Sequence, residues 1–238
     1  MNEKKSNIMP TEKQVYFIGI LPTDDGNIKE SDKKIFGTHG DGKIEAKGDN
    51  AAFYYRRHSG DENGQTYYKW GTVVVIDYYT HCIVSDCKGV KSPKFCLSLI
   101  EEKNQNVIHE SSSDWIADSE YVMTGRIHVG DENQPSNIIS KRIYVTLKEN
   151  VDSCIELEKC NPKTVISKKE SDGTDVMYEI GEFYDVDGKP VTIYLPITGR
   201  NHSGDENGKT ITTFTQFGFV LDDNGVQLKG IDLQEIIK

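Results

Sequence analysis

One eight-residue pattern, R-x-H-[SV]-G-D-E-N, is written three times in this chain of 238 residues. The copies, here called octets, occupy residues 56–63, 126–133 and 200–207, and their histidines lie 70 and 74 residues apart. Self-similarity at a nearly fixed interval constrains architecture more than any single local motif does. The pattern therefore indicates internal triplication of one structural unit.

The spacing of the octets predicts the division of the chain. We expect a flexible N-terminus at residues 1–10, a first β unit at 11–80, a second at 81–150, and a third at 151–238 that includes a C-terminal tail. Each unit of about 70 residues is small for an independent domain. The sequence leaves open whether the units are separate domains or one domain with pseudo-threefold symmetry.

Hydrophobicity alternates with a period of two before each octet. Counted back from the histidine, positions -7, -5 and -3 are mostly apolar, whereas positions -4, -2 and 0 carry the arginine and histidine on a polar face. This alternation predicts a half-buried strand. Apolar residues at +15 and +17 predict a second strand, and the Gly and Asn of the octet suit a hairpin tip. Each unit is therefore predicted to contain a β-hairpin.

Further strands and turns complete an all-β prediction. "QVYFIGI", "KFCLSLI" and "KTVISK" read as strands, and "DDGN", "GDGK", "DVDGK" and "DDNG" read as polar turns. "IDLQEIIK" predicts a short C-terminal helix, and "VDSCIELEK" has a weaker helical pattern. The expected fold is all-β, with antiparallel, sandwich-like sheets in three internal pseudo-repeats of about 70 residues.

The octet residues are the candidate ligand-binding residues, because planar polar groups on one rim can bracket the hydroxyls of a sugar. The set is Arg56, His58, Asp61, Glu62, Asn63, Arg126, His128, Asp131, Glu132, Asn133, Arg200, His202, Asp205, Glu206 and Asn207. Tyr54, Tyr55, Tyr67, Tyr68 and Trp70 are candidates to stack on such a ligand. These residues favour a lectin-like, multivalent binding protein for a glycan or another polar small molecule.

A structural role of the octets stays open beside the binding role. Each arginine is able to clamp an octet carboxylate bidentately while the histidine bonds a loop carbonyl, which would fix the hairpin without any ligand. The alternative function is then a self-assembling structural or interaction protein in which the octets are salt-bridge locks. A homo-oligomer is compatible with this alternative.

Metal binding and catalysis are further hypotheses. The octet carboxylates and amides offer hard oxygen ligands for calcium, although the spacing departs from an EF-hand loop and no cofactor is expected. Three converging histidines would make a zinc-type site, and a metal-dependent enzyme is the third alternative. No catalytic residue is assigned, because no recognised nucleophile, phosphate or zinc-protease motif is present.

The overall charge limits the classes of partner that we expect the protein to bind. A net charge of -10 argues against nucleic acid, whose recognition needs a concentrated basic surface. No apolar run long enough for a membrane span occurs, and the charged N-terminus has no signal-peptide core. Five cysteines without a CxxC pair fit free thiols better than a disulfide framework. We expect a soluble protein that is cytoplasmic or released without a classical signal peptide.

Overall fold

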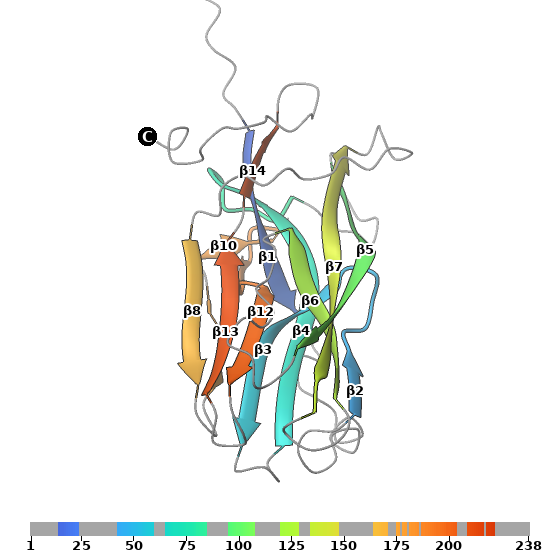
Figure 1. Ribbon diagram of the computed structural model, residues 1–238. Coiled ribbons are helices and arrows are strands. Elements are labelled where there is room, and N and C mark those ends of the chain that lie inside the picture. The colour runs from blue at the N-terminus through green and yellow to red at the C-terminus, as the bar shows by residue number, and fades with distance from the viewer. Residues whose placement is uncertain are drawn as a thin grey trace, which may run out of the picture.

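The architecture is that of a computed structural model, shown in Figure 1. It describes residues 14–23, 42–59, 65–84, 95–107, 120–128, 134–147, 164–170, 175–176, 178–179, 181–185, 187–203, 209–216 and 218–221. The predicted helical segments at 151–159 and 231–238 and the N-terminus at 1–10 lie outside these residues. No helix occurs in the described residues, and none there is long and apolar enough to cross a membrane.

The described regular structure consists of strands. They are β1 Gln14–Pro22, β2 Gly42–Glu45, β3 Ala51–Ser59, β4 Gln65–Asp77, β5 Phe95–Val107, β6 Tyr121–His128, β7 Ser136–Leu147, β8 Thr164–Glu170, β9 Asp175–Val176, β10 Phe183–Tyr184, β11 Pro190–Val191, β12 Ile197–Ser203, β13 Lys209–Gln216 and β14 Gly218–Leu221. The three strands predicted from "QVYFIGI", "KFCLSLI" and "KTVISK" correspond to β1, β5 and β8.

All pairings between these strands are antiparallel, so the predicted all-β antiparallel class is confirmed. Within the described residues the strand orders are β14-β1-β4-β3-β9, β2-β6-β7-β5, β12-β13-β8 and β10-β11. The hairpins β3-β4, β6-β7 and β12-β13 flank the octets, and their octet ends point to the lower end of the molecule in Figure 1. Strands from distant parts of the chain share sheets, as β14 pairs with β1 and β2 pairs with β6.

The sheets enclose two main apolar clusters. One cluster packs β1, β3 and β4 against β5, β6 and β7, and it includes Ile18, Val73, Leu97 and Ile143. The second cluster takes residues from all three hairpins, among them the fully buried side chains Phe53, Tyr68, Met123, Ile138 and Phe214. Burying each large apolar side chain stabilises the fold by about 1.5–3 kcal/mol. The three hairpins are thus held to each other by a shared core.

The motif "DVDGK" forms the turn expected from its sequence. The Asp185 carboxylate accepts hydrogen bonds from the backbone N–H groups of Asp187 and Lys189, both at 2.9 Å, and Gly188 has a φ of 76°. An Asp that bonds its own backbone in this way stabilises a tight turn. The turn connects β10 to β11.

Candidate functional site

The described octet side chains are buried. Arg56, Arg126 and Arg200 are 4%, 4% and 3% exposed, and His128 is 1% exposed. His58 and His202 belong to β3 and β12, but their side chains lie outside the described part of the structure. The Asp, Glu and Asn of all three octets, residues 61–63, 131–133 and 205–207, also lie outside it.

At the octets, the face that was predicted to be polar lies in the core: Arg56, Arg126 and Arg200 are buried, whereas the next residues, Arg57, Ile127 and Asn201, are exposed or half-buried. Before the first octet, Tyr54 and Tyr55 of β3 are each 5% exposed and belong to the same core cluster. β3, β6 and β12 contact one another, and the arginine that each of them carries is buried. The arginines therefore lie inside the protein, where an isolated charge is costly unless other groups stabilise it.

A β-bulge explains why the arginines face the core. In each of the three hairpins the register shifts at the same place relative to the octet, between Phe53 and Tyr55, Met123 and Gly125, and Ile197 and Gly199. A bulge inserts one residue and reverses the side to which later side chains point. In each hairpin the arginine comes three residues after a core residue, which is Phe53, Met123 or Ile197. Because the bulge lies between the two, the arginine points to the same side of the strand as that core residue.

Hydroxyl groups fix the bulge in two hairpins. The hydroxyl of Thr124 donates to the carbonyl of Ile139 at 3.4 Å, and that of Thr198 donates to the carbonyl of Thr213 at 3.2 Å. A Cβ on Gly125 would come within 3.0 Å of the Ile44 carbonyl oxygen. The close approach at Gly125 is that of β2, which pairs with β6, and a glycine permits it; the bulge itself does not require glycine, because Tyr55 holds this position in β3.

The three arginines lie near one another around Tyr68. Burial and the like charges of Arg200 and Arg126 together lower the pKa of Arg56 to about 9, and Tyr68 opposes this change. Arg56 remains protonated at neutral pH. We call Arg56, Arg126, Arg200 and Tyr68 the arginine centre.

The three arginines change the acidity of Tyr68. Burial alone would raise the pKa of this phenol, but Arg56, Arg126 and Arg200 outweigh burial and lower it. Tyr68 lies opposite Arg56 in the β3-β4 register and is 0% exposed. Its hydroxyl meets no hydrogen-bond acceptor among the described residues. The centre thus combines guanidinium donors with a phenolic donor.

Ser136 is a site residue that the sequence pattern did not single out. Its Oγ accepts a hydrogen bond from Nη2 of Arg126 at 3.1 Å and lies 2.9 Å from Nδ1 of His128. In the registers of the three hairpins, the octet histidine lies opposite Thr66, Ser136 or Thr210. Each octet histidine is followed eight positions later by a threonine or serine, and this repetition in the sequence could have identified Ser136.

The aromatic residues of the first unit do not form the expected surface platform. Tyr54 stacks on Tyr194 with ring centroids 4.7 Å apart, and Tyr55, Tyr68 and Trp70 are at most 6% exposed. Phe53 packs against Tyr68 at 4.9 Å. The prediction that Tyr54, Tyr55, Tyr68 and Trp70 stack on a sugar at the surface is therefore wrong, because all four side chains belong to the core.

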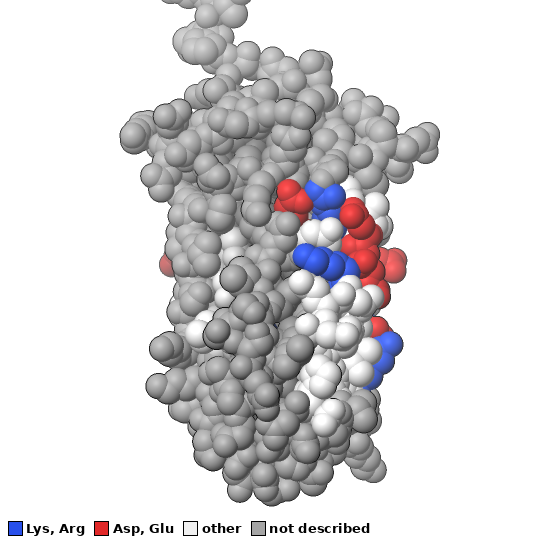
Figure 2. All heavy atoms as spheres, viewed as in Figure 1, with Lys and Arg blue, Asp and Glu red and all other residues white. Residues whose placement is uncertain are grey.

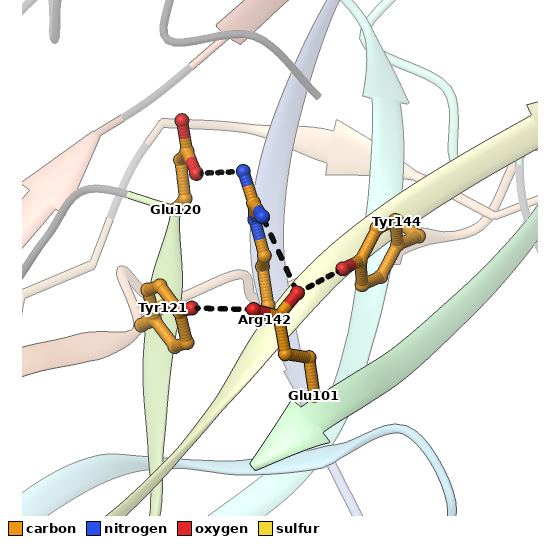
Figure 3. Close-up of polar contacts among 5 residues, drawn as sticks. All are labelled: Glu101, Glu120, Tyr121, Arg142 and Tyr144. Atoms are coloured by element: carbon orange, nitrogen blue, oxygen red, sulfur yellow. Dashed lines mark hydrogen bonds and ion pairs between the residues drawn. The ribbon is translucent and has the colours of Figure 1, made fainter. Parts of the chain in front are cut away.

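A second polar cluster lies on β5, β6 and β7, and we call it the Glu101 cluster (Figure 3). Its members are Glu101, Glu120, Tyr121, Arg142 and Tyr144. Arg142 bonds Glu101 at 3.3 Å and Glu120 at 2.5 Å, and the hydroxyls of Tyr144 and Tyr121 donate to the two oxygens of Glu101. Figure 2 shows acidic and basic side chains side by side on the face where Figure 1 places β5 and β7.

Glu101 combines backbone strain with an exposed side chain. Its φ of 59° is in the left-handed region, and it is the extra residue of a bulge between Ile100 and Glu102. Its side chain is 52% exposed. Hydrogen bonds from Tyr144 and then from Arg142 lower the pKa of the Glu101 carboxyl below its usual value. Such strain persists where surrounding contacts hold the residue in place.

Metal ligands and known relatives give no further assignment. Within the described residues, no group of three or more His, Cys, Asp or Glu side chains is placed to hold a metal ion. Cys82 is a free thiol and is half-buried. No family model, curated protein or solved structure matches the chain.

Proposed function

We propose that this is a multivalent, lectin-like binding protein whose three octets act together, from one end of the molecule, on a sugar or another polar ligand. The observation that carries the proposal is the mutual proximity of Arg56, Arg126 and Arg200. Each octet starts at one of these arginines, so the three octets leave the core from the same region. Groups clustered in this way contact one ligand or neighbouring groups of one glycan.

The proposal gives the buried arginines and the other polar octet residues different roles. The arginines are 3–4% exposed, which suits positioning residues better than groups that wait for a ligand in solvent. The octet Asp, Glu and Asn residues are then the ligand contacts, and calcium is a further candidate for their oxygen atoms. Sites held close together gain affinity through a high effective concentration of the second contact.

Part of the proposal is that the three units are structural repeats. Its support is the identical place of the bulge, the hydroxyl residue opposite each histidine, and the Thr-to-carbonyl bond that Thr124 and Thr198 share. Three unrelated hairpins would have no reason to share these details. Mutual contacts of β3, β6 and β12 are compatible with a pseudo-threefold arrangement.

The second candidate is the structural or interaction protein in which octets are locks. The burial of the three arginines favours it, since a buried guanidinium needs polar or charged partners, and removing one partner of a buried pair is strongly destabilising. The two candidates differ in what the octet acids do. In the first they bind a ligand, and in the second they hold the arginines.

The deciding experiment replaces Asp61, Asp131 and Asp205 together by Asn. Thermal melts are recorded for this octet variant and wild type with EDTA, with calcium, and with a panel of monosaccharides. A matched variant, Asp49→Asn with Glu179→Gln and Glu182→Gln, removes the same number of negative charges from exposed positions. A ligand that binds the folded state but not the unfolded state raises the melting temperature, and the shift grows with the logarithm of the ligand concentration above Kd.

The proposal expects one additive to stabilise wild type and the matched variant but not the octet variant. That additive names the ligand class. If no additive stabilises wild type and the octet variant melts lower than the matched variant, the octets are locks and the binding function is wrong.

A further inference from the structure

β5 is an outer strand of the sheet β2-β6-β7-β5 in the part of the chain that the structure describes. It is 13 residues long, and the side chains of Ile100, Glu101, Glu102, Asn104 and Asn106 are exposed along it. The free edge of an outer strand presents backbone N–H and C=O groups to which a strand of another molecule pairs. We propose that the bulge at Glu101 prevents β5 from pairing with β5 of a second copy of this chain. This goes beyond the proposed function and does not depend on it, because no octet residue is involved.

The first half of β5 has the composition of a strand that associates with itself. Residues 95–100, "FCLSLI", contain no charged residue, proline or glycine. Short segments of this kind pair readily with copies of themselves when their edge is accessible. Ile100, the last residue of the segment, is 44% exposed. Two identical segments that pair antiparallel around a twofold axis form a closed dimer. A second copy is therefore the partner that suits this edge.

The bulge interrupts the edge directly after the apolar segment. Ile100 pairs with Arg142 of β7. The next pair is Glu102 with Lys141, so Glu101 is an extra residue between two neighbouring pairs. Alternate residues of a regular antiparallel strand direct their N–H and C=O groups outward, and one inserted residue changes which residues do so. A straight incoming strand consequently does not bond to both halves of β5 in one register.

Charged residues accompany the bulge. Glu101, Glu102 and Lys103 follow the apolar segment without a gap, and both glutamates are exposed. Charges that flank an apolar β segment oppose its self-association, because pairing of two copies partly removes those charges from water. Bulges and charged side chains are the two devices with which natural sheets protect an outer strand. β5 carries both devices at the same place.

The Glu101 cluster holds the bulge in its strained conformation. Glu101 has a φ of 59°, which is unfavourable for a residue with a side chain. Figure 3 shows that its carboxylate accepts hydrogen bonds from three side chains, which are those of Tyr121, Arg142 and Tyr144. These donors belong to β6 and β7, so they fix the extra residue to the neighbouring strands. Strain persists where surrounding contacts determine the conformation in this way.

The first experiment removes the extra residue from the full-length protein. In a variant that lacks Glu101, the pairs on either side of the bulge become consecutive, so β5 keeps its other partners in β7. The weight-average mass of this variant and of wild type is measured by analytical ultracentrifugation across a series of protein concentrations. We expect the mass of the variant to rise with concentration to about twice that of wild type, as a closed dimer requires.

Two control variants separate edge pairing from a general loss of stability. Glu101→Asn removes the charge but keeps the extra residue, because asparagine tolerates a left-handed backbone, and it should keep the mass of wild type. Ile100→Glu, added to the variant that lacks Glu101, restores the number of negative charges at the edge and should return the mass to that of wild type. Hydrogen exchange locates the contact, since amides within residues 95–107 should exchange more slowly in the associated variant.

A folded variant without Glu101 that keeps the mass of wild type at every concentration would contradict the inference, as would association that Ile100→Glu does not reverse. If the variant does not unfold cooperatively, the comparison is repeated with Glu101→Val combined with Glu102→Val. Valine disfavours a left-handed φ and removes both charges, so this variant should also associate, and a wild-type mass would overturn the inference. Melts with sugars or calcium test the octets separately, so failure of this inference and failure of the proposed function are distinguishable.

Discussion

The arginine centre and the Glu101 cluster both contain arginine, but the surroundings lower the pKa of the arginine in the first and raise it in the second. Arg56, Arg126 and Arg200 come from equivalent places in three hairpins and are buried together, whereas Arg142 belongs to one hairpin and lies between two carboxylates. The pKa of Arg56 is lowered by burial and like charge. Burial also opposes the charge of Arg142, but Glu120 and Glu101 raise its pKa overall.

This difference separates two uses of charge in one small protein. In the Glu101 cluster, Arg142 is paired with two carboxylates, and one of them, Glu101, is the extra residue of the β5 bulge. The arginine centre contains the residue with which each of the three octets begins. A residue pattern kept in three copies is more informative about function than a polar cluster present once.

The largest effect is expected at the arginine centre. Arg200→Ala should lower the free energy of unfolding by about 1–3 kcal/mol, because it removes a buried side chain and leaves neighbouring polar groups unsatisfied. Chemical denaturation measures the change. Arg57→Ala, at an exposed position, should change it by less than about 0.5 kcal/mol. Equal effects of the two substitutions would contradict a special role of the centre.

Ser136 tests whether the hydroxyl opposite the histidine matters. Ser136→Ala should cost about 1–2 kcal/mol of unfolding free energy, since Arg126 and His128 both lose a buried contact. Ser136→Thr should restore most of it, because threonine occupies the corresponding register position in the other two hairpins. The idea of a shared site geometry would be untenable if Ala and Thr behaved alike.

Glu101 offers a smaller effect with a built-in comparison. Glu101→Ala loses the bonds to Tyr144 and Arg142 and keeps the left-handed backbone, whereas Glu101→Gly loses the same bonds and removes the strain. The glycine variant should therefore be more stable than the alanine variant by about 1 kcal/mol. Urea denaturation of the two variants gives the difference. A more stable alanine variant would show that the φ of 59° is not held in solution.

The smallest expected effect is a loss of stability at acid pH, which concerns the Glu101 cluster and not the arginine centre. The pKa of Glu101 is lower in the folded protein than its usual 4.5, so its contribution is present above pH 4.5 and is lost as the pH falls through the folded value. The arginines stay charged throughout this range. The stability difference between wild type and Glu101→Gln should shrink from pH 6 to pH 3. A difference that stays constant would mean that the Glu101 charge contributes nothing.

The sequence predicted the hairpins but not where their arginines point. Alternation and turn residues were sufficient for β3-β4, β6-β7 and β12-β13 and for the antiparallel class. The bulge was not predictable from alternation, because one inserted residue reverses the alternation without any change in composition. Arg56 was consequently placed on a polar outer face, and in the structure it is 4% exposed.

The Glu101 cluster could not be predicted for a different reason. Its residues come from β5, from β6 with Glu120 just before it, and from β7, and they share no motif or spacing. A left-handed backbone usually signals Gly or Asn in a sequence, so Glu101 gave no hint of its φ. Ser136 could have been predicted from the sequence, since aligning the three units beyond the octets shows a hydroxyl residue at the same position in each.

The most direct test of convergence is a double-mutant cycle between Arg56→Met and Arg200→Met, with Arg57→Met and Arg200→Met as the distant-face control. Like charges in contact predict that the double substitution costs more unfolding free energy than the sum of the single ones, by at least about 0.5 kcal/mol. This is because each single substitution already relieves the repulsion. Additivity within about 0.3 kcal/mol, as in the control pair, would show that the three octets do not share a centre.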